Sequence, residues 1–259
     1  MPHALTTTLL ALGLFLSILA ALEVGRRIGC SRRRRFPDGE LKGSGAAEGA
    51  VFGLLGLLIA FTFSGAASRF DDRRQLITQE ANAIGTAWLR VDLLPAPVAH
   101  TVRDFMRSYL DARLETFRQI ANPEALAAQS ERASRLQQQI WAAAVTGSAA
   151  SGAAPDAAKL LLPALNEMID ITTTRLVATR THPPLAIFLM LGVLSLIGGL
   201  LIGYELAAKP QRDWLQMLIF PLVMAVSLFV ILDLEYPRRG LIRIDAADQV
   251  LVELRQSMD

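Results

Sequence analysis

Few side chains in this sequence are of the types that carry out catalysis or hold metal ions. The only cysteine is Cys30, and the three histidines are His3, His100 and His182, all far apart. No spacing typical of a zinc protease, a serine hydrolase, a phosphate-binding loop or a dinucleotide site occurs. We therefore predict a protein that is not an enzyme, with no catalytic residue, no metal site and no cofactor.

One polar group stands on a long helix predicted below. It consists of Glu80, Asn82, Arg90 and Asp92. Such a group is either part of an active site or part of the solvated surface of a helical bundle, and charged residues are seldom buried. We interpret its carboxylates as belonging to a solvated bundle surface.

A second charged group follows the last apolar segment of the chain. Its position predicts that it lies at the edge of a membrane, where its members can pair with one another or with phosphate headgroups. The residues are Asp233, Glu235, Arg238, Arg239 and Arg243.

The apolar residues decide the class of protein. They make up 52% of the chain and gather in four segments, 5–24, 49–67, 185–204 and 214–232. Each segment approaches the ~20 residues that cross a hydrocarbon core. The chain is therefore predicted to be an integral membrane protein with the lipid bilayer as its partner. The formal charge of +2 is too small to indicate a nucleic-acid partner.

We predict an all-α membrane protein with four transmembrane helices and a four-helix soluble bundle inserted between the second and third spans. The predicted parts are the first span (1–25), a basic cytoplasmic linker (26–44), the second span (45–67), the helical soluble domain (68–183), the third span (184–206), a short loop (207–213), the fourth span (214–232) and a C-terminal tail (233–259) that ends in an amphipathic helix.

The second span and the first bundle helix are predicted to be one continuous helix over 45–94. Its polar half carries apolar residues at alternating steps of four and three, typical of one buried stripe. Further helices are expected over 98–121, over 123–146 after the capping residue Asn122, and from 156 to about 182. The stripe consists of Ile77, Ala81, Ile84, Trp88 and Val91.

The apolar half of that helix carries a stripe of small residues, which lets another helix approach closely. Two readings remain open from the sequence. The stripe either packs inside one subunit or joins subunits around a pore. The helix-packing residues are Gly45, Gly49, Gly53, Gly56 and Ala60.

Larger residues lie on a flank beside this stripe. They either face lipid and neighbouring helices or line a pore, where stacked apolar rings gate by excluding water. Glu48 would then lie at the inner mouth. The pore-lining candidates are Glu48, Phe52, Leu55, Ile59 and Phe63.

Orientation follows from the arginines in short loops. Arg26, Arg27 and the run 32–35 are the strongest positive cluster, which places the 26–44 linker in the cytoplasm of a bacterial inner-membrane protein. The bundle and both termini are then outside. Arginines at 69, 73, 74, 238, 239 and 243 favour the opposite orientation.

Three stretches resemble the bacterial bestrophin-like family of membrane proteins. They are GLLGLLIAFTFSGAASRFD at 53–71, EANAIGTAWLRVDLLP at 80–95 and LDLEYPRRGLIRI at 232–244. The resemblance covers nearly the whole chain and is remotely linked to true bestrophins, which are pentameric anion channels with a pore lined by the second span. It implies a homo-oligomer, pentameric by that analogy, that conducts inorganic ions.

The sequence also departs from true bestrophins. Its charges favour the reverse orientation, and it lacks their acidic calcium-binding cluster. The functional hypothesis is an oligomeric channel with the second span lining the pore. The alternative is a non-conducting sensor or scaffold that uses the helical bundle to bind a ligand or partner.

Overall fold

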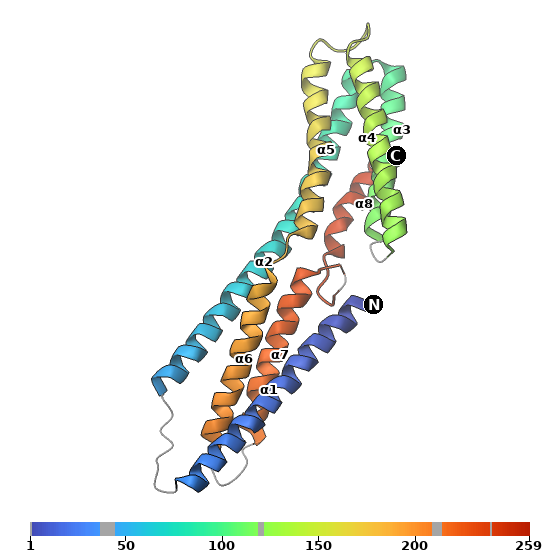
Figure 1. Ribbon diagram of the computed structural model, residues 1–259. Coiled ribbons are helices and arrows are strands. Elements are labelled where there is room, and N and C mark those ends of the chain that lie inside the picture. The colour runs from blue at the N-terminus through green and yellow to red at the C-terminus, as the bar shows by residue number, and fades with distance from the viewer. Residues whose placement is uncertain (1, 37–44, 119–121, 209–213, 239) are drawn as a thin grey trace. The chain divides into compact units, whose positions relative to one another are not determined.

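The computed structural model describes residues 2–36, 45–118, 122–208, 214–238 and 240–259, and every regular element among them is helical (Figure 1). The α-helices are α1 (Pro2–Arg35), α2 (Gly45–Arg90), α3 (Ala96–Arg118), α4 (Pro123–Ser148), α5 (Ala157–Arg180), α6 (Leu185–Leu206), α7 (Trp214–Glu235) and α8 (Gln249–Gln256). Two short 3₁₀ helices, η1 (Val91–Leu93) and η2 (Asp245–Asp248), follow α2 and precede α8.

Four helical stretches in the described part of the chain are long and apolar enough to cross a membrane. They are Leu5–Arg35, Gly45–Leu93, Ala157–Leu206 and Met217–Glu235. Together with the absence of strands from the described residues, they confirm the predicted all-helical class with four apolar helices.

The chain divides into two compact units. The first contains residues 1–70 and 182–242, and the second contains residues 71–181 and 243–259. Helix α2 contributes its apolar half to the first unit and its polar half to the second. The predicted tail, 233–259, is divided between the two units.

In the first unit, α1 and α6 approach each other closely through glycines. Gly25 and Gly29 on α1 are spaced by four residues, as are Gly199 and Gly203 on α6. A Cβ atom built at Gly25 would lie 2.0 Å from the carbonyl oxygen of Leu200, so no side chain fits there. Pairs of small residues with this spacing allow such helix contacts in membranes.

The apolar core of the first unit draws on α1, α2, α6 and α7. Between helices in lipid, close packing rather than exclusion of water supplies the stability. Its buried members are Ile18, Leu22, Leu55, Leu191, Leu206, Met217 and Met224.

The second unit is built around the polar half of α2 with α3, α4 and α5. Four members of the predicted stripe are buried, namely Ile77, Ala81, Ile84 and Val91. Trp88 is half-buried, and the guanidinium of Arg107 lies over its ring, 5.2 Å from the centroid. The period of the apolar residues therefore identified the buried face of this half of the helix.

Local signals also set the ends of the helices in this unit. Asn122 caps α4, because its side-chain oxygen accepts hydrogen bonds from the backbone N–H groups of Glu124 and Ala125 at 3.2 and 3.3 Å.

Helix α8 packs with α3, and Arg107 of α3 donates to the carbonyl of Met258, just after α8, at 2.8 Å.

Candidate functional site

The small-residue face of α2 has no partner within the described part of the subunit. Gly45, Gly49, Gly53, Gly56 and Ala60 are all exposed, and a Cβ atom built at any of these glycines meets no atom within 4 Å. By contrast, the glycines of the α1–α6 contact leave no such space. Packing inside one subunit does not account for this face, and its role in joining subunits stays a prediction.

The predicted pore-lining residues have different surroundings. Leu55 is 3% exposed and belongs to the core of the first unit, against which Phe52 and Ile59 also pack. The Phe52 ring meets the Phe220 ring of α7 edge-on, with 5.8 Å between centroids. Phe63 is 46% exposed. The structure thus places three of the candidates against helices of their own subunit.

Glu48, the remaining candidate, is half-buried near the start of α2. Its carboxyl approaches the carboxyl of Glu205 near the end of α6. The proposed inner mouth therefore carries a carboxyl from each of two helices in one subunit.

Other large apolar residues of α2 are exposed beside the small-residue face. Leu57 is 50% exposed and Phe61 is 69% exposed. Steps of four residues from Gly53 lead to Leu57 and then to Phe61, so these three positions lie along one side of the helix. This side of α2 is an apolar surface that its own subunit leaves open in the described structure.

Two membrane-edge carboxylates at the end of α7 are buried and have partners. Asp233 accepts hydrogen bonds from the backbone N–H groups of Leu241 and Ile242 at 3.0 and 2.7 Å, which closes the turn after α7. Gly240 lies so close that a Cβ atom there would be 2.0 Å from an Asp233 oxygen. Asp233 is thus the carboxylate around which this turn is built.

Glu235 joins three elements of the first unit. Its carboxylate pairs with the guanidinium of Arg69 on α2 and lies 3.3 Å from Nδ1 of His182, which precedes α6. The His182 ring stacks on Tyr236, with 4.6 Å between centroids. Burying a carboxylate is costly unless it is paired, and these contacts offset that cost.

The other membrane-edge residues are less central to this arrangement. Arg243 pairs with Asp245 in the second unit. Arg238 is half-buried with a polar contact of its own, and Arg239 lies outside the described residues. The sequence had not identified Arg69 or His182 as partners of Glu235. Their positions beside the second and third apolar segments were the available signal.

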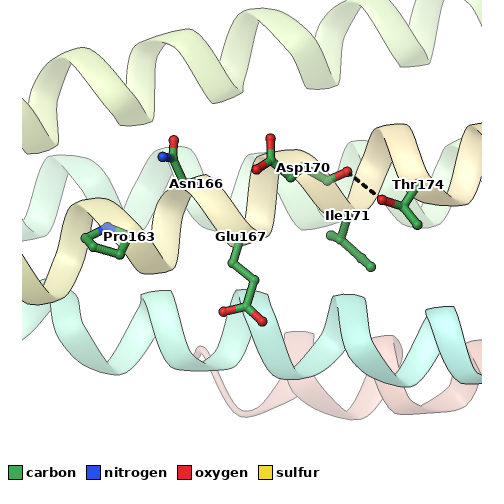
Figure 2. A pocket seen from close by; sticks show the side chains of 6 residues that line it. All are labelled: Pro163, Asn166, Glu167, Asp170, Ile171 and Thr174. Carbon is green, nitrogen blue, oxygen red and sulfur yellow. Dashed lines mark hydrogen bonds between the residues drawn. The ribbon is translucent and has the colours of Figure 1, made fainter.

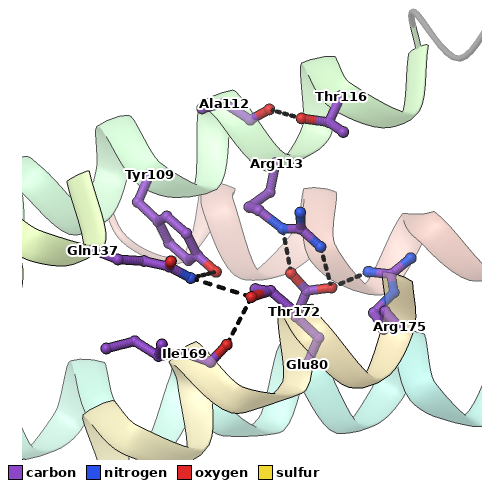
Figure 3. Close-up of polar contacts among 9 residues, drawn as sticks. All are labelled: Glu80, Tyr109, Ala112, Arg113, Thr116, Gln137, Ile169, Thr172 and Arg175. Atoms are coloured by element: carbon purple, nitrogen blue, oxygen red, sulfur yellow. Dashed lines mark hydrogen bonds and ion pairs between the residues drawn. The ribbon is translucent and has the colours of Figure 1, made fainter. Parts of the chain in front are cut away.

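The second unit contains a buried ion network, and it corrects the reading of Glu80 as a surface residue. Glu80 is fully buried. Arg113 of α3 donates two hydrogen bonds to its carboxylate, from Nε at 2.6 Å and from Nη2 at 3.2 Å. Arg175 of α5 forms an ion pair with the same carboxylate (Figure 3). The other members of the predicted group are not fully buried, and Asn82 and Asp92 are exposed.

The surroundings of Glu80 determine its charge. Burial raises the pKa of this carboxyl, but Arg113 and Arg175 outweigh burial and hold the pKa below its ordinary value. Burial likewise raises the pKa of the neighbouring Tyr109 hydroxyl, which stays neutral and contacts Gln137 at 3.3 Å. Charges that are fixed at neutral pH therefore link α2, α3 and α5, and the uncharged contact between Gln137 and Tyr109 adds α4.

One surface depression of the described structure lies on α5. Its lining consists of residues from that helix alone, so no second element encloses a ligand (Figure 2). Within the same described residues, no three His, Cys, Asp or Glu side chains gather as a metal site would require. The depression is lined by Pro163, Asn166, Glu167, Asp170, Ile171 and Thr174.

Comparison with known proteins identifies the family. The family model for the bestrophin-like domain matches residues 46–248, which is most of the sequence. The chain belongs to the bestrophin-like family. This bestrophin-like chain also shares its fold with a crystal structure of a mutant bacterial bestrophin homologue from Klebsiella pneumoniae. The TM-score is 0.68 at 13% identity, covering 95% of this chain and 98% of that chain. No curated protein matches.

The bestrophin-like match includes the charged turn after α7 and the α2 face described above, apart from Gly45. It therefore covers both regions that the sequence had singled out, and the resemblance recognised in the sequence is confirmed.

Proposed function

We propose that this bestrophin-like protein is one subunit of an oligomeric ion channel in a bacterial inner membrane, with α2 lining the pore. The observation that carries the proposal is the open side of α2. A long apolar helix exposes a continuous row of small residues while its opposite side packs into the subunit core. Membership of a family known for channels supports the same conclusion.

Assembly accounts for the small-residue face. Glycine and alanine let helices come close in lipid, where van der Waals contact is a main source of affinity. Several subunits related by a rotation axis would bring their α2 helices together around that axis. A pentamer is the expected number by analogy with true bestrophins, and inorganic ions are the transported species.

The narrowest part of the proposed pore is formed by exposed apolar side chains of α2. Leu57 and Phe61, four residues apart, are large exposed side chains on the open side. Rings of such side chains exclude water and so resist ion passage. The row predicted from the sequence, Leu55, Ile59 and Phe63, remains a competing proposal that requires rearrangement, because Leu55 is enclosed by its own subunit.

Planar-bilayer recording of the purified protein tests this proposal. Replacing Phe61 by Ala should raise the current severalfold, because the smaller ring admits water. Leu222→Ala is the matched control: Leu222 is an exposed apolar residue of α7, so its truncation should leave the current unchanged.

Ile59→Ala separates the two rows. A rise in current for Ile59→Ala with none for Phe61→Ala would favour the competing row. Well-assembled protein that carries no current in any variant would favour the sensor or scaffold function.

A further inference from the structure

The end of α1 carries a group of exposed cationic side chains that pair with no other residue in the described part of the chain. Arg32, Arg34 and Arg35 are exposed and have no hydrogen-bond or ion-pair partner among the described residues. Their neighbour Arg33 donates to the carbonyl of Ala208, just after α6, at 2.7 Å. The segment is therefore attached to the subunit at one position while three guanidinium groups point into the surroundings.

The contact between α1 and α6 fixes the depth of this group. A Cβ atom built at Gly29 would lie 2.6 Å from the Cβ of Ala207, so Gly29 lies level with the point where α6 has just left its apolar run at Leu206. Arg32 follows three residues later, about 4.5 Å farther along the helix axis. That distance places the arginines in the headgroup layer, which adds several ångströms to each side of the hydrocarbon core.

Apolar residues flank the arginines as they do at a membrane interface. Ile28 precedes Arg32 by one turn of α1, and Phe36, the residue after α1, donates its backbone N–H to the carbonyl of Arg32 at 2.9 Å. Both apolar side chains are exposed, Phe36 to 58%. Helices that lie at a membrane interface likewise combine arginines or lysines with exposed Phe and Leu side chains.

Two general roles of basic residues do not explain why these three arginines lack partners. Cations in the last turn of a helix complement its dipole, and positive loops orient a membrane protein. Exposure alone does not leave an arginine of α1 unpaired, since the Arg27 side chain is 77% exposed and still pairs with Glu23 at 3.0 Å. At the end of α1, no carboxylate of the described residues pairs with these three arginines.

We propose that Arg32, Arg34 and Arg35 form a binding surface for anionic phospholipid headgroups. Guanidinium groups bind phosphate oxygens through paired hydrogen bonds, and each basic residue near an anionic membrane adds attraction worth about fivefold in affinity. The surface does not depend on ion conduction, so it holds for a channel and for a scaffold alike.

Native mass spectrometry of the full-length protein in detergent tests the surface. The probes are phosphatidylglycerol and phosphatidylcholine with identical acyl chains. The wild type should retain phosphatidylglycerol in clear preference, and added salt should weaken that preference. The combined variant Arg32→Gln, Arg34→Gln and Arg35→Gln should lower the preference by at least tenfold.

Two further variants keep the outcome interpretable. Changing the same three residues to Lys should retain most of the preference, since the charge stays. Changing Arg132, Arg135 and Arg180 to Gln removes the same number of exposed charges from the second unit and should have no effect. If the first combined variant does not assemble, Arg34→Gln alone should lower the preference about fivefold.

The proposal is overturned if the Gln variants at the end of α1 keep the wild-type preference. It is equally overturned if the control variant loses as much, because the effect would then reflect net charge alone.

Discussion

Two buried carboxylates in this protein each have charged or polar partners. Glu80 sits among Arg113 and Arg175, and Glu235 sits beside Arg69 and His182. In both places the partners come from other elements or connections of the chain. Removing one partner of a buried pair leaves an uncompensated charge, which is far more costly than losing a surface ion pair. These carboxylates therefore fix how their helices pack.

The Glu80 network predicts an order of stabilities. Glu80→Gln leaves two buried guanidinium groups without their carboxylate and should lower the free energy of unfolding by about 3–5 kcal/mol. Arg175→Met should cost less, because the neutral pair of Glu80 and Arg113 remains. Thermal unfolding in detergent, followed by circular dichroism, measures the order. Glu131→Gln on the exposed side of α4 is the control and should change little.

The same network predicts the direction of the pH dependence. The pKa of Glu80 is lower in the folded state than in the unfolded state, so its stabilisation is fully present above the unfolded value, about 4.3, and is lost as pH falls through the folded value. Acid should therefore destabilise the wild type more than Glu80→Gln. Equal acid sensitivity of the two proteins, or a Glu80→Gln variant as stable as the wild type at pH 7, would contradict the role given to this carboxylate.

At the scale of elements, the glycines of the first unit perform two different tasks. Gly25 and Gly203 are enclosed at the contact between α1 and α6, where no side chain fits. Gly53 and Gly56 on α2 face open space. The first pair explains how one subunit folds, and the second pair is available for contact between subunits.

This difference predicts the effect of a larger side chain on α2. Gly53→Leu should leave the subunit folded, since nothing lies within 4 Å of the new side chain's Cβ atom. It should weaken assembly by roughly tenfold, because the helices of neighbouring subunits can no longer approach closely. Size measurement in mild detergent gives the result.

Gly13→Leu on α1, also in open space, is the control for that experiment. Assembly of Gly53→Leu that matches both the control and the wild type would remove the small-residue face from the subunit interface.

At the scale of the whole molecule, much of the helical architecture was predictable because lipid and water impose strong patterns. The four apolar stretches and the buried stripe through Ile77 and Ile84 follow directly from length and period. Glu80 was misread because its partners lie 33 and 95 residues along the chain. No local sequence pattern predicts an ion pair between helices that are far apart in the chain.

The open side of α2 could not be read from the sequence for a different reason. In a helix surrounded by lipid, residues that face the core and residues that face outward are both apolar, so the pattern does not distinguish Leu55 from Leu57. Only the packing of α1, α6 and α7 shows that Leu55 is enclosed while Leu57 is half exposed.

Reaction of substituted cysteines during planar-bilayer recording tests the central claim most directly. In a Cys30→Ser background, a water-soluble thiol reagent should alter the current of Leu57→Cys and Phe61→Cys by more than half, because these positions line the water-filled path. It should leave Leu55→Cys unaffected. Modification of Leu55→Cys and Ile59→Cys alone, or the absence of current from well-assembled protein, would contradict a pore lined by the open side of α2.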